Sequence, residues 1–230
     1  MQEIILKGIK MRFCYAFRRF SDYPYLGNAF DMDPERITPR FLKRVKEMGF
    51  DGIELGIECL EKINGGENGI KEFAKKLEGH GTPLLAIRSG GLMIDPKFGE
   101  NNYNRIISSF KFAEFFNTKL INGAISIPEK SPYLDTGTEL ISSEWVAHAG
   151  LPFSQNSSRE TSLPEYELLA KKYSEVCDIA KDFDISISCE VHQNSPVDNS
   201  WSAKLIHKLV NRDNFGINPC LLYTSDAADE

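Results

Sequence analysis

The sequence has no long apolar run and no excess of basic residues. Its apolar stretches are only a few residues long, as at 83–87, so we expect no segment to cross a bilayer. Lysine and arginine number 27 against 33 aspartates and glutamates, for a net charge of −6. Nucleic-acid binding needs clustered positive charge. We therefore expect neither a membrane nor a nucleic-acid partner.

The five cysteines show no pairing pattern: they form no CxxC motif and no even framework. This pattern indicates that the cysteines are free thiols in a protein of a reducing compartment. The first residues carry an early acid, Glu3, and too short an apolar stretch for a signal peptide. We expect a cytoplasmic protein.

Short strand-like runs alternate with helical patterns along the whole chain, and 41% hydrophobic residues are enough to form a core. The predicted strands cover residues 11–17, 51–56, 84–87, 119–126, 185–192 and Phe215–Asn218. The predicted helices cover residues 39–48, 70–77, 103–116, 163–182 and 201–210. This order demands right-handed parallel crossovers.

The strand spacing predicts an α/β fold of the (β/α)8 TIM-barrel type. A barrel of ~250 residues averages about 31 residues for each of its eight strand–helix units. The spacing of the strand starts fits this value except for one long interval, between 119 and 185. About six strands and five helices are present, so the barrel is incomplete or the sheet is open. A doubly wound sheet is the alternative, but residues 18–26 lack its glycine-rich phosphate loop.

The domain prediction is one partial barrel over residues 1–218. The long interval contains an insertion at 128–160, rich in Ser, Pro, Asn and Gly, which we expect on the C-terminal face as a lid or as an unstructured decoration. Residues 219–230 fit neither pattern. They resemble a tail that recurs at the ends of unrelated predicted proteins from environmental sequencing, so we expect native sequence to end near Asn218.

The fifth predicted strand carries the most informative side chains. Alternation with period two puts Glu190 and His192 on one face and the apolar residues on the other, and both polar residues come last, at the C-terminal mouth. A buried carboxylate without a partner costs several kcal/mol. Two interpretations stay open: a divalent metal bound by Glu190 with His192 as co-ligand or substrate contact, or a structural pair of Glu190 with an Arg or a His.

Glu54 and Arg88 repeat the pattern on the second and third predicted strands. Alternation points both toward the same interior face. They are candidates for binding substrate, through a sugar hydroxyl or a phosphate, or for a purely structural ion pair.

Several motifs together resemble the xylose isomerase-like TIM barrel superfamily. They are GFDGIEL at 49–55, LAIR at 85–88, the segment 112–125, and CEVH at 189–192 followed by NSPVD at 194–198. Its members include sugar-phosphate isomerases and epimerases, ketose 3-epimerases, inosose dehydratases and endonuclease IV. The resemblance implies a divalent metal, Mn²⁺ or Mg²⁺ first and Co²⁺ or Zn²⁺ next, with Glu190 as a ligand and as one acid/base.

The same comparison shows departures from the family pattern. The next ligand is usually the aspartate of G-x-N-x-D, but residues 216–220 read GINPC, which puts Cys220 in its place. The histidine and second glutamate of later strands are absent. We therefore expect this fragment to be inactive.

The leading hypothesis is a metal-dependent sugar or sugar-phosphate isomerase or epimerase that transfers a proton through an enediolate. An endonuclease IV-type phosphodiesterase is an alternative. The resemblance implies for that enzyme a metal site built from many histidines, and this chain has only four histidines. A non-catalytic sugar-binding barrel is the third. The expected partner is a sugar or polyol substrate. The sequence leaves open whether the chain forms a homo-oligomer.

Overall fold

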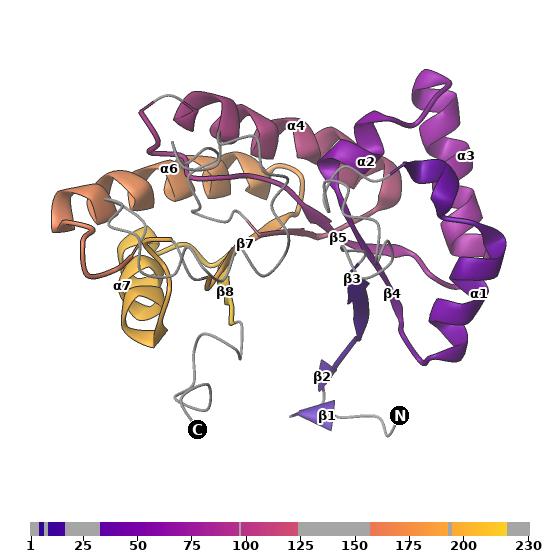
Figure 1. The fold of residues 1–230 in the computed structure, drawn as a ribbon, viewed down its shortest axis with the longest axis horizontal. Coiled ribbons are helices and arrows are strands. Elements are labelled where there is room, and N and C mark those ends of the chain that lie inside the picture. The colour runs from indigo at the N-terminus through magenta and orange to yellow at the C-terminus, as the bar shows by residue number, and fades with distance from the viewer. Residues whose placement is uncertain are drawn as a thin grey trace, which may run out of the picture. The chain divides into compact units, whose positions relative to one another are not determined.

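The structure, a computed structural model, describes residues 5–6, 9–16, 33–96, 98–123, 157–192 and 195–219 (Figure 1). The strands are β1 (Ile5–Leu6), β2 (Ile9–Lys10), β3 (Cys14–Ala16), β4 (Gly52–Gly56), β5 (Leu84–Arg88), β6 (Leu120–Asn122), β7 (Ser186–Glu190) and β8 (Phe215–Asn218). The helices are α1 (Pro39–Glu47), α2 (Ile57–Glu61), α3 (Gly66–Gly79), α4 (Gly99–Phe116), α6 (Leu163–Lys181) and α7 (Ser200–Val210), and Pro34–Arg36 form a 3₁₀ turn.

The strand order confirms the predicted α/β fold of the TIM-barrel type. Strands β3 to β8 follow one another in a single six-stranded sheet in chain order, and β1 and β2 form a separate antiparallel pair. The registered pairs of the large sheet are parallel. The chain divides into two compact units: the first holds residues 1–88 and 111–119, the second residues 89–110 and 120–230.

In the first unit, one face of β3 and β4 contacts aromatic residues of α1 and of the turn that follows it. The Tyr15 ring meets the rings of Phe41 and Phe50 edge-on, at centroid distances of 5.6 and 5.3 Å. Tyr15 is in register with Ile53. Ile53 therefore shares this helix-facing side, and Glu54, the next residue, lies on the opposite side.

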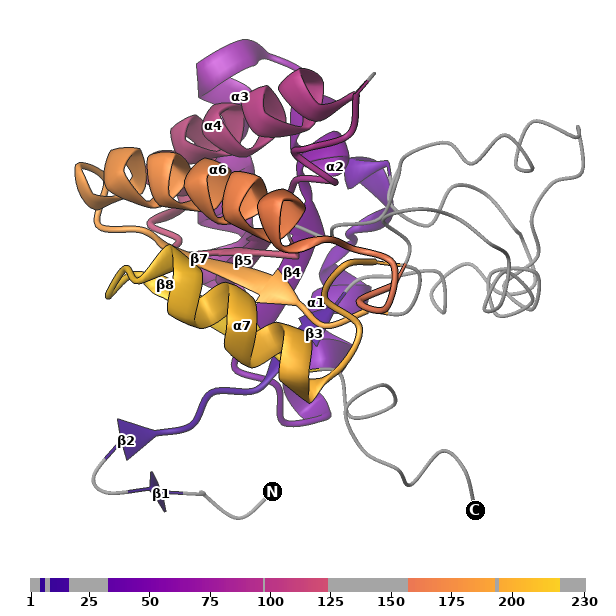
Figure 2. The ribbon, with the colours of Figure 1, turned by 90° about the vertical axis from the view of Figure 1, so that its left-hand side faces the viewer.

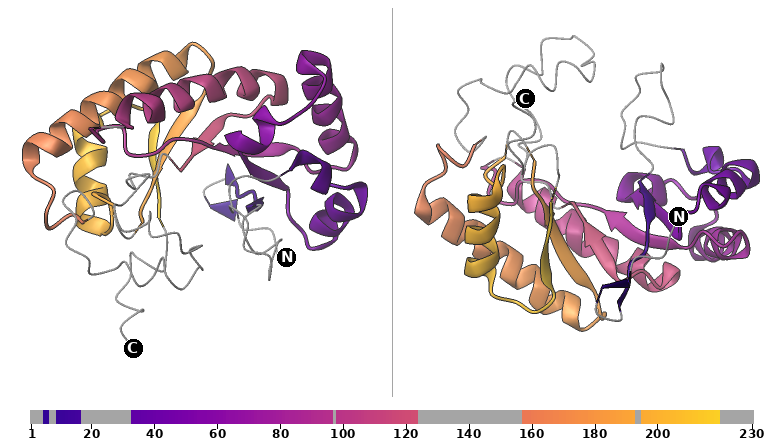
Figure 3. Two further views of the ribbon diagram at one scale, coloured as in Figure 1. Left: turned by 45° about the horizontal axis from the view of Figure 1, so that its top comes forward. Right: turned by 90° about the horizontal axis from the view of Figure 1, so that it is seen from below.

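In the second unit, α6 and α7 pack against β7 and β8 (Figure 2). The Phe215 ring contacts Tyr173 of α6 at 5.0 Å and His207 of α7 at 6.2 Å between centroids. Phe215 is in register with Ile187. These two residues therefore mark the helix-facing side of β7 and β8, which Figure 3 shows beside α6 and α7.

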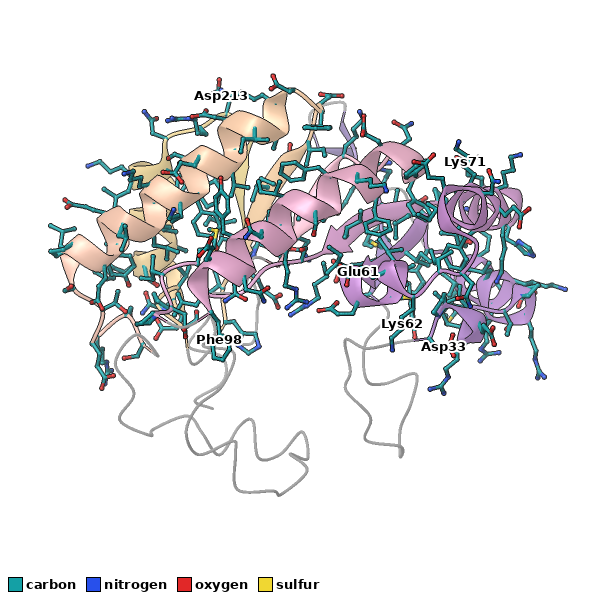
Figure 4. The ribbon with its side chains drawn as sticks, turned by 90° about the horizontal axis from the view of Figure 1, so that it is seen from above. Asp33, Glu61, Lys62, Lys71, Phe98 and Asp213 are labelled. Atoms are coloured by element: carbon teal, nitrogen blue, oxygen red, sulfur yellow. The ribbon has the colours of Figure 1, made fainter. Side chains whose placement is uncertain are left out.

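Helix starts follow their sequence signals. The Phe41 N–H donates to the Thr38 hydroxyl at 3.2 Å, with Pro39 at the first helical position. At the start of α6, Glu165 accepts from both the backbone N–H and the hydroxyl of Ser162. Charged side chains lie on the surface: Lys71 of α3 and Asp213, between α7 and β8, are exposed (Figure 4).

Some predicted features differ from the structure or fall outside it. Helix α2 follows β4 directly and was not predicted, because five residues are too few to show a helical period. Within the described residues, no helix is long and apolar enough to cross a membrane. Most of the 128–160 insertion, and Cys220 with the rest of the tail beyond 219, lie outside the described residues.

Candidate functional site

Glu190 ends β7 with its side chain on the side away from the helices. Ile187 faces α6 and α7 through its register partner Phe215, so alternation turns Ser188 and Glu190 the other way. The Glu190 side chain is only 4% exposed. This carboxyl group is therefore buried at the C-terminal end of a parallel strand. Barrel enzymes have their catalytic residues at this end of the strands.

His192 lies two residues beyond β7, in the turn that leads to α7. Its N–H donates to the Val197 carbonyl at 2.9 Å, and its carbonyl accepts from the Ser195 hydroxyl at 2.8 Å. The residue is half-buried. The backbone at His192 is therefore fixed by the loop that follows.

That loop is anchored to α6 and to the start of α7. The buried Tyr166 hydroxyl donates to the Pro196 carbonyl at 2.6 Å, and burial raises the pKa of this phenol. Asp198 accepts from the Ser158 N–H at 3.1 Å. Asn199 caps α7 and donates to the Ser158 hydroxyl at 2.7 Å. The described residues of the loop after β7, 195–199, are therefore tied by hydrogen bonds to α6 and to the segment before it.

Three uncharged side chains share the Glu190 face of the second unit. The Asn122 Oδ1 accepts from the Ser188 hydroxyl at 2.8 Å and from the Asn218 Nδ2 at 2.9 Å. Asn122 is in register with Ser188, and Asn218 with Glu190. Sequence reasoning missed Asn122 and Asn218, because it followed titratable groups. The available signal for Asn218 was its position at the end of a predicted strand, within the GINPC stretch, whereas Asn122 lies in the middle of the predicted strand 119–126 and gave no such signal.

Glu54 and Arg88 belong to the first unit, on neighbouring strands. Glu54 is in register with Ala86 and Gly56 with Arg88, so the two charged side chains share one face, one pleat apart. They are 7% and 8% exposed. Burial, and then the Glu54 carboxylate, raises the pKa of the Cys14 thiol to about 12. Cys14 is thus not an activated nucleophile.

The described residues do not complete a metal site. No group of three or more His, Cys, Asp and Glu side chains in this part of the chain is arranged to hold a metal ion. Glu190 supplies one carboxylate, and the oxygen donors on its face are the carboxamides of Asn122 and Asn218 and the Ser188 hydroxyl. The Asn122 Oδ1 accepts from both Ser188 and Asn218, which leaves that oxygen no spare lone pair for a metal.

A cavity of about 320 Å³ in the second unit lies behind this face, not on it. Ile217, in register with Cys189, lines it together with Val191 and His207. Cys189 and Ile217 share the helix-facing side with Ile187 and Phe215. The cavity is therefore separate from Glu190.

Comparison with known proteins identifies the fold. A family model described as xylose isomerase-like TIM barrel matches residues 42–225. No curated protein matches.

Solved structures agree with this family. A probable 3-DHS dehydratase, AsbF, from Bacillus anthracis superposes with a TM-score of 0.63 at 16% identity, covering 92% of this chain and 64% of that one. A xylose isomerase-like TIM barrel protein from Mycobacterium smegmatis, in complex with magnesium, gives 0.63 at 19%, covering 91% and 64%. A D-psicose 3-epimerase in the presence of D-fructose gives 0.58 at 13%, covering 91% and 63%. At these identities the likeness shows the fold, and the chain spans under two thirds of each structure's length.

Proposed function

Because the chain belongs to the xylose isomerase-like TIM barrel family, we propose that it acts on a sugar or sugar phosphate as part of a divalent-metal-dependent isomerase or epimerase. The observation that carries this proposal is the buried Glu190 carboxylate at the C-terminal end of β7, on the side away from the helices. Neighbours of the same fold include a magnesium complex and a ketose epimerase studied with D-fructose.

Glu190 is the base in the proposed chemistry. Its carboxylate takes the proton from the carbon next to the sugar carbonyl, so a C–H bond breaks and an O–H bond forms. The C–H electron pair becomes the C=C bond of an enediolate, and the carbonyl π pair moves to oxygen. Return of a proton to the other carbon gives the isomer, and return to the opposite face gives the epimer, with no change in overall composition.

The proposed metal is Mn²⁺ or Mg²⁺, because the donors on this face are hard oxygens. Glu190 is the buried carboxylate that the described part of the second unit offers it. His192 is proposed to contact substrate from the turn after β7. Since Glu190 alone, as both ligand and base, does not make a full site, we expect weak binding of metal and sugar by this chain but no turnover.

The first test is the substitution Glu190→Gln, which removes the charge and keeps the shape. We expect the affinity for Mn²⁺, measured by calorimetric titration, to fall at least about 100-fold, since loss of even an outer-shell partner costs 10–100-fold. Glu167→Gln, on the exposed face of α6, is the matched control and should leave the affinity unchanged.

Equal Mn²⁺ affinities in the wild-type and Glu190→Gln proteins would overturn the proposal and leave Glu190 with a structural role. Nicking of a duplex that contains an abasic site would indicate phosphodiester chemistry in its place. A thermal melt of each variant, without metal, checks that the fold is retained.

A further inference from the structure

The second unit contains a hydrogen-bonded bridge between carboxamides across the face that carries Glu190. Asn122 ends β6 and Asn218 ends β8, and β7 lies between these strands. Their side chains nevertheless meet, with the Asn218 Nδ2 donating to the Asn122 Oδ1 at 2.9 Å. The bridge therefore passes over β7.

The register places the bridge next to Glu190. Asn122 is the partner of Ser188, and Asn218 is the partner of Glu190, two residues further on. The bridge thus crosses β7 diagonally, between Ser188 and Glu190, and the Ser188 hydroxyl ties it to β7 through its 2.8 Å bond to the same Asn122 oxygen. Glu190 flanks the bridge on its C-terminal side.

Hydrogen bonding at Asn122 sets the orientation of Asn218. The Asn122 oxygen accepts two hydrogen bonds, which uses both of its lone pairs. An amide group is planar, with its nitrogen and oxygen on separate branches, so an Asn218 nitrogen directed at Asn122 turns the Asn218 oxygen away from it. Neighbouring strands lie about 4.8 Å apart. The Asn218 oxygen is therefore presented on the face and in the row of the Glu190 carboxylate.

Burial makes this arrangement specific. Asn122 is 6% exposed and Ser188 is 7% exposed, so loss of their mutual hydrogen bond would leave a buried polar group unsatisfied. Asn218 is half-buried. One end of the bridge is thus anchored in the interior, and the other end is accessible.

We propose that Asn122 is a positioning residue that orients Asn218, so that the Asn218 oxygen and the Glu190 carboxylate together accept hydrogen bonds from adjacent hydroxyl groups of the sugar. Each of these two acceptor oxygens can take a hydrogen bond from one sugar hydroxyl. This inference rests on the proposed function and assigns one of its substrate contacts.

The test compares Asn122→Leu with Asn122→Asp. Leucine removes the acceptor, whereas an aspartate carboxylate still accepts from Ser188 and Asn218. We expect Asn122→Leu and Asn218→Ala to weaken binding of D-fructose about 10-fold, which corresponds to one lost hydrogen bond. The affinity of Asn122→Asp for D-fructose should stay within about twofold of wild type. Asn104→Leu, on the exposed side of α4, is the control. Sugar binding is followed by NMR saturation transfer and Mn²⁺ binding by calorimetry.

The outcomes separate this inference from the proposed function. Loss of Mn²⁺ binding in Glu190→Gln, together with unchanged fructose binding in Asn122→Leu and Asn218→Ala, would overturn the role of Asn122 alone. Equal losses in Asn122→Leu and Asn122→Asp, with lowered melting temperatures, would make its role structural and also overturn the inference. A wild-type protein that binds neither probe would overturn both.

Discussion

Gly52 is the residue at which the first unit depends most closely on the absence of a side chain. A Cβ on Gly52 would press on the Pro83 carbonyl oxygen and lie 2.5 Å from the Leu85 Cγ. Backbone on one side and a packed leucine on the other leave little room to shift. Gly79, near the exposed end of α3, has no neighbouring atom within 4 Å of such a Cβ.

Alanine at these two glycines should change stability in opposite directions. We expect Gly52→Ala to lower the free energy of unfolding by about 1–3 kcal/mol, through overpacking next to β5. Gly79→Ala should raise it by about 0.5–1 kcal/mol, because alanine favours helix. Urea denaturation of both variants measures the difference, and an unchanged or raised free energy of unfolding in Gly52→Ala would contradict the close packing at Gly52.

At the scale of elements, α7 connects helix capping to the turn that carries His192. The Asn199 Oδ1 accepts from the N–H groups of Trp201 and Ser202 at 2.9 and 3.0 Å, and its Nδ2 donates to Ser158. One side chain thus begins the helix and holds the loop after β7 to the segment before α6.

Substitutions at Asn199 should separate these two roles. Asn199→Ala removes both, and we expect it to cost about 1–2 kcal/mol of unfolding free energy. Asn199→Ser keeps a cap acceptor, loses the Nδ2 donor to Ser158 and Asp198, and should cost less. Chemical denaturation monitored by circular dichroism gives both values, and a serine as damaging as alanine would show that the cap contributes little.

At the scale of the whole molecule, each of the two units contains a cysteine whose reactivity can report on the unfolding of that unit. Burial, and then Asp178, raises the pKa of the Cys177 thiol to about 12, and the Cys14 thiol in the first unit is shifted to about the same value. The pKa of an unperturbed cysteine thiol is 9.0. The folded state therefore holds the proton more tightly than the unfolded state, so this contribution to stability is present below pH 9 and is lost as the pH rises from 9 toward 12.

Both thiols should resist alkylation in the native protein. At pH 8, we expect iodoacetamide to label the buried Cys177 only when its unit opens, and to label the half-buried Cys14 more slowly than a free thiol, since the thiolate is the reactive form. Peptide mass spectrometry across a urea gradient gives a labelling midpoint for each site. Rapid labelling of Cys177 without urea would contradict its burial in α6.

The sequence by itself determined the class of fold, because a period of two in strands and of 3.6 in helices follows from burying one face of each element. The family was indicated by the resemblance of its motifs. Thr38, Ser162 and the alternation along β7 could be interpreted without coordinates, and the structure places Glu190 on the expected side. The roles predicted for Glu190, His192, Glu54 and Arg88 stay predictions.

Only the tertiary structure decided which side chains meet across strands. The bridge from Asn122 to Asn218 joins residues 96 positions apart, and no local pattern encodes the register that brings them over Ser188. The short helix α2 likewise has too few residues to carry a period. Local periodicity specifies which face a residue occupies, whereas its neighbours on that face depend on how the strands align.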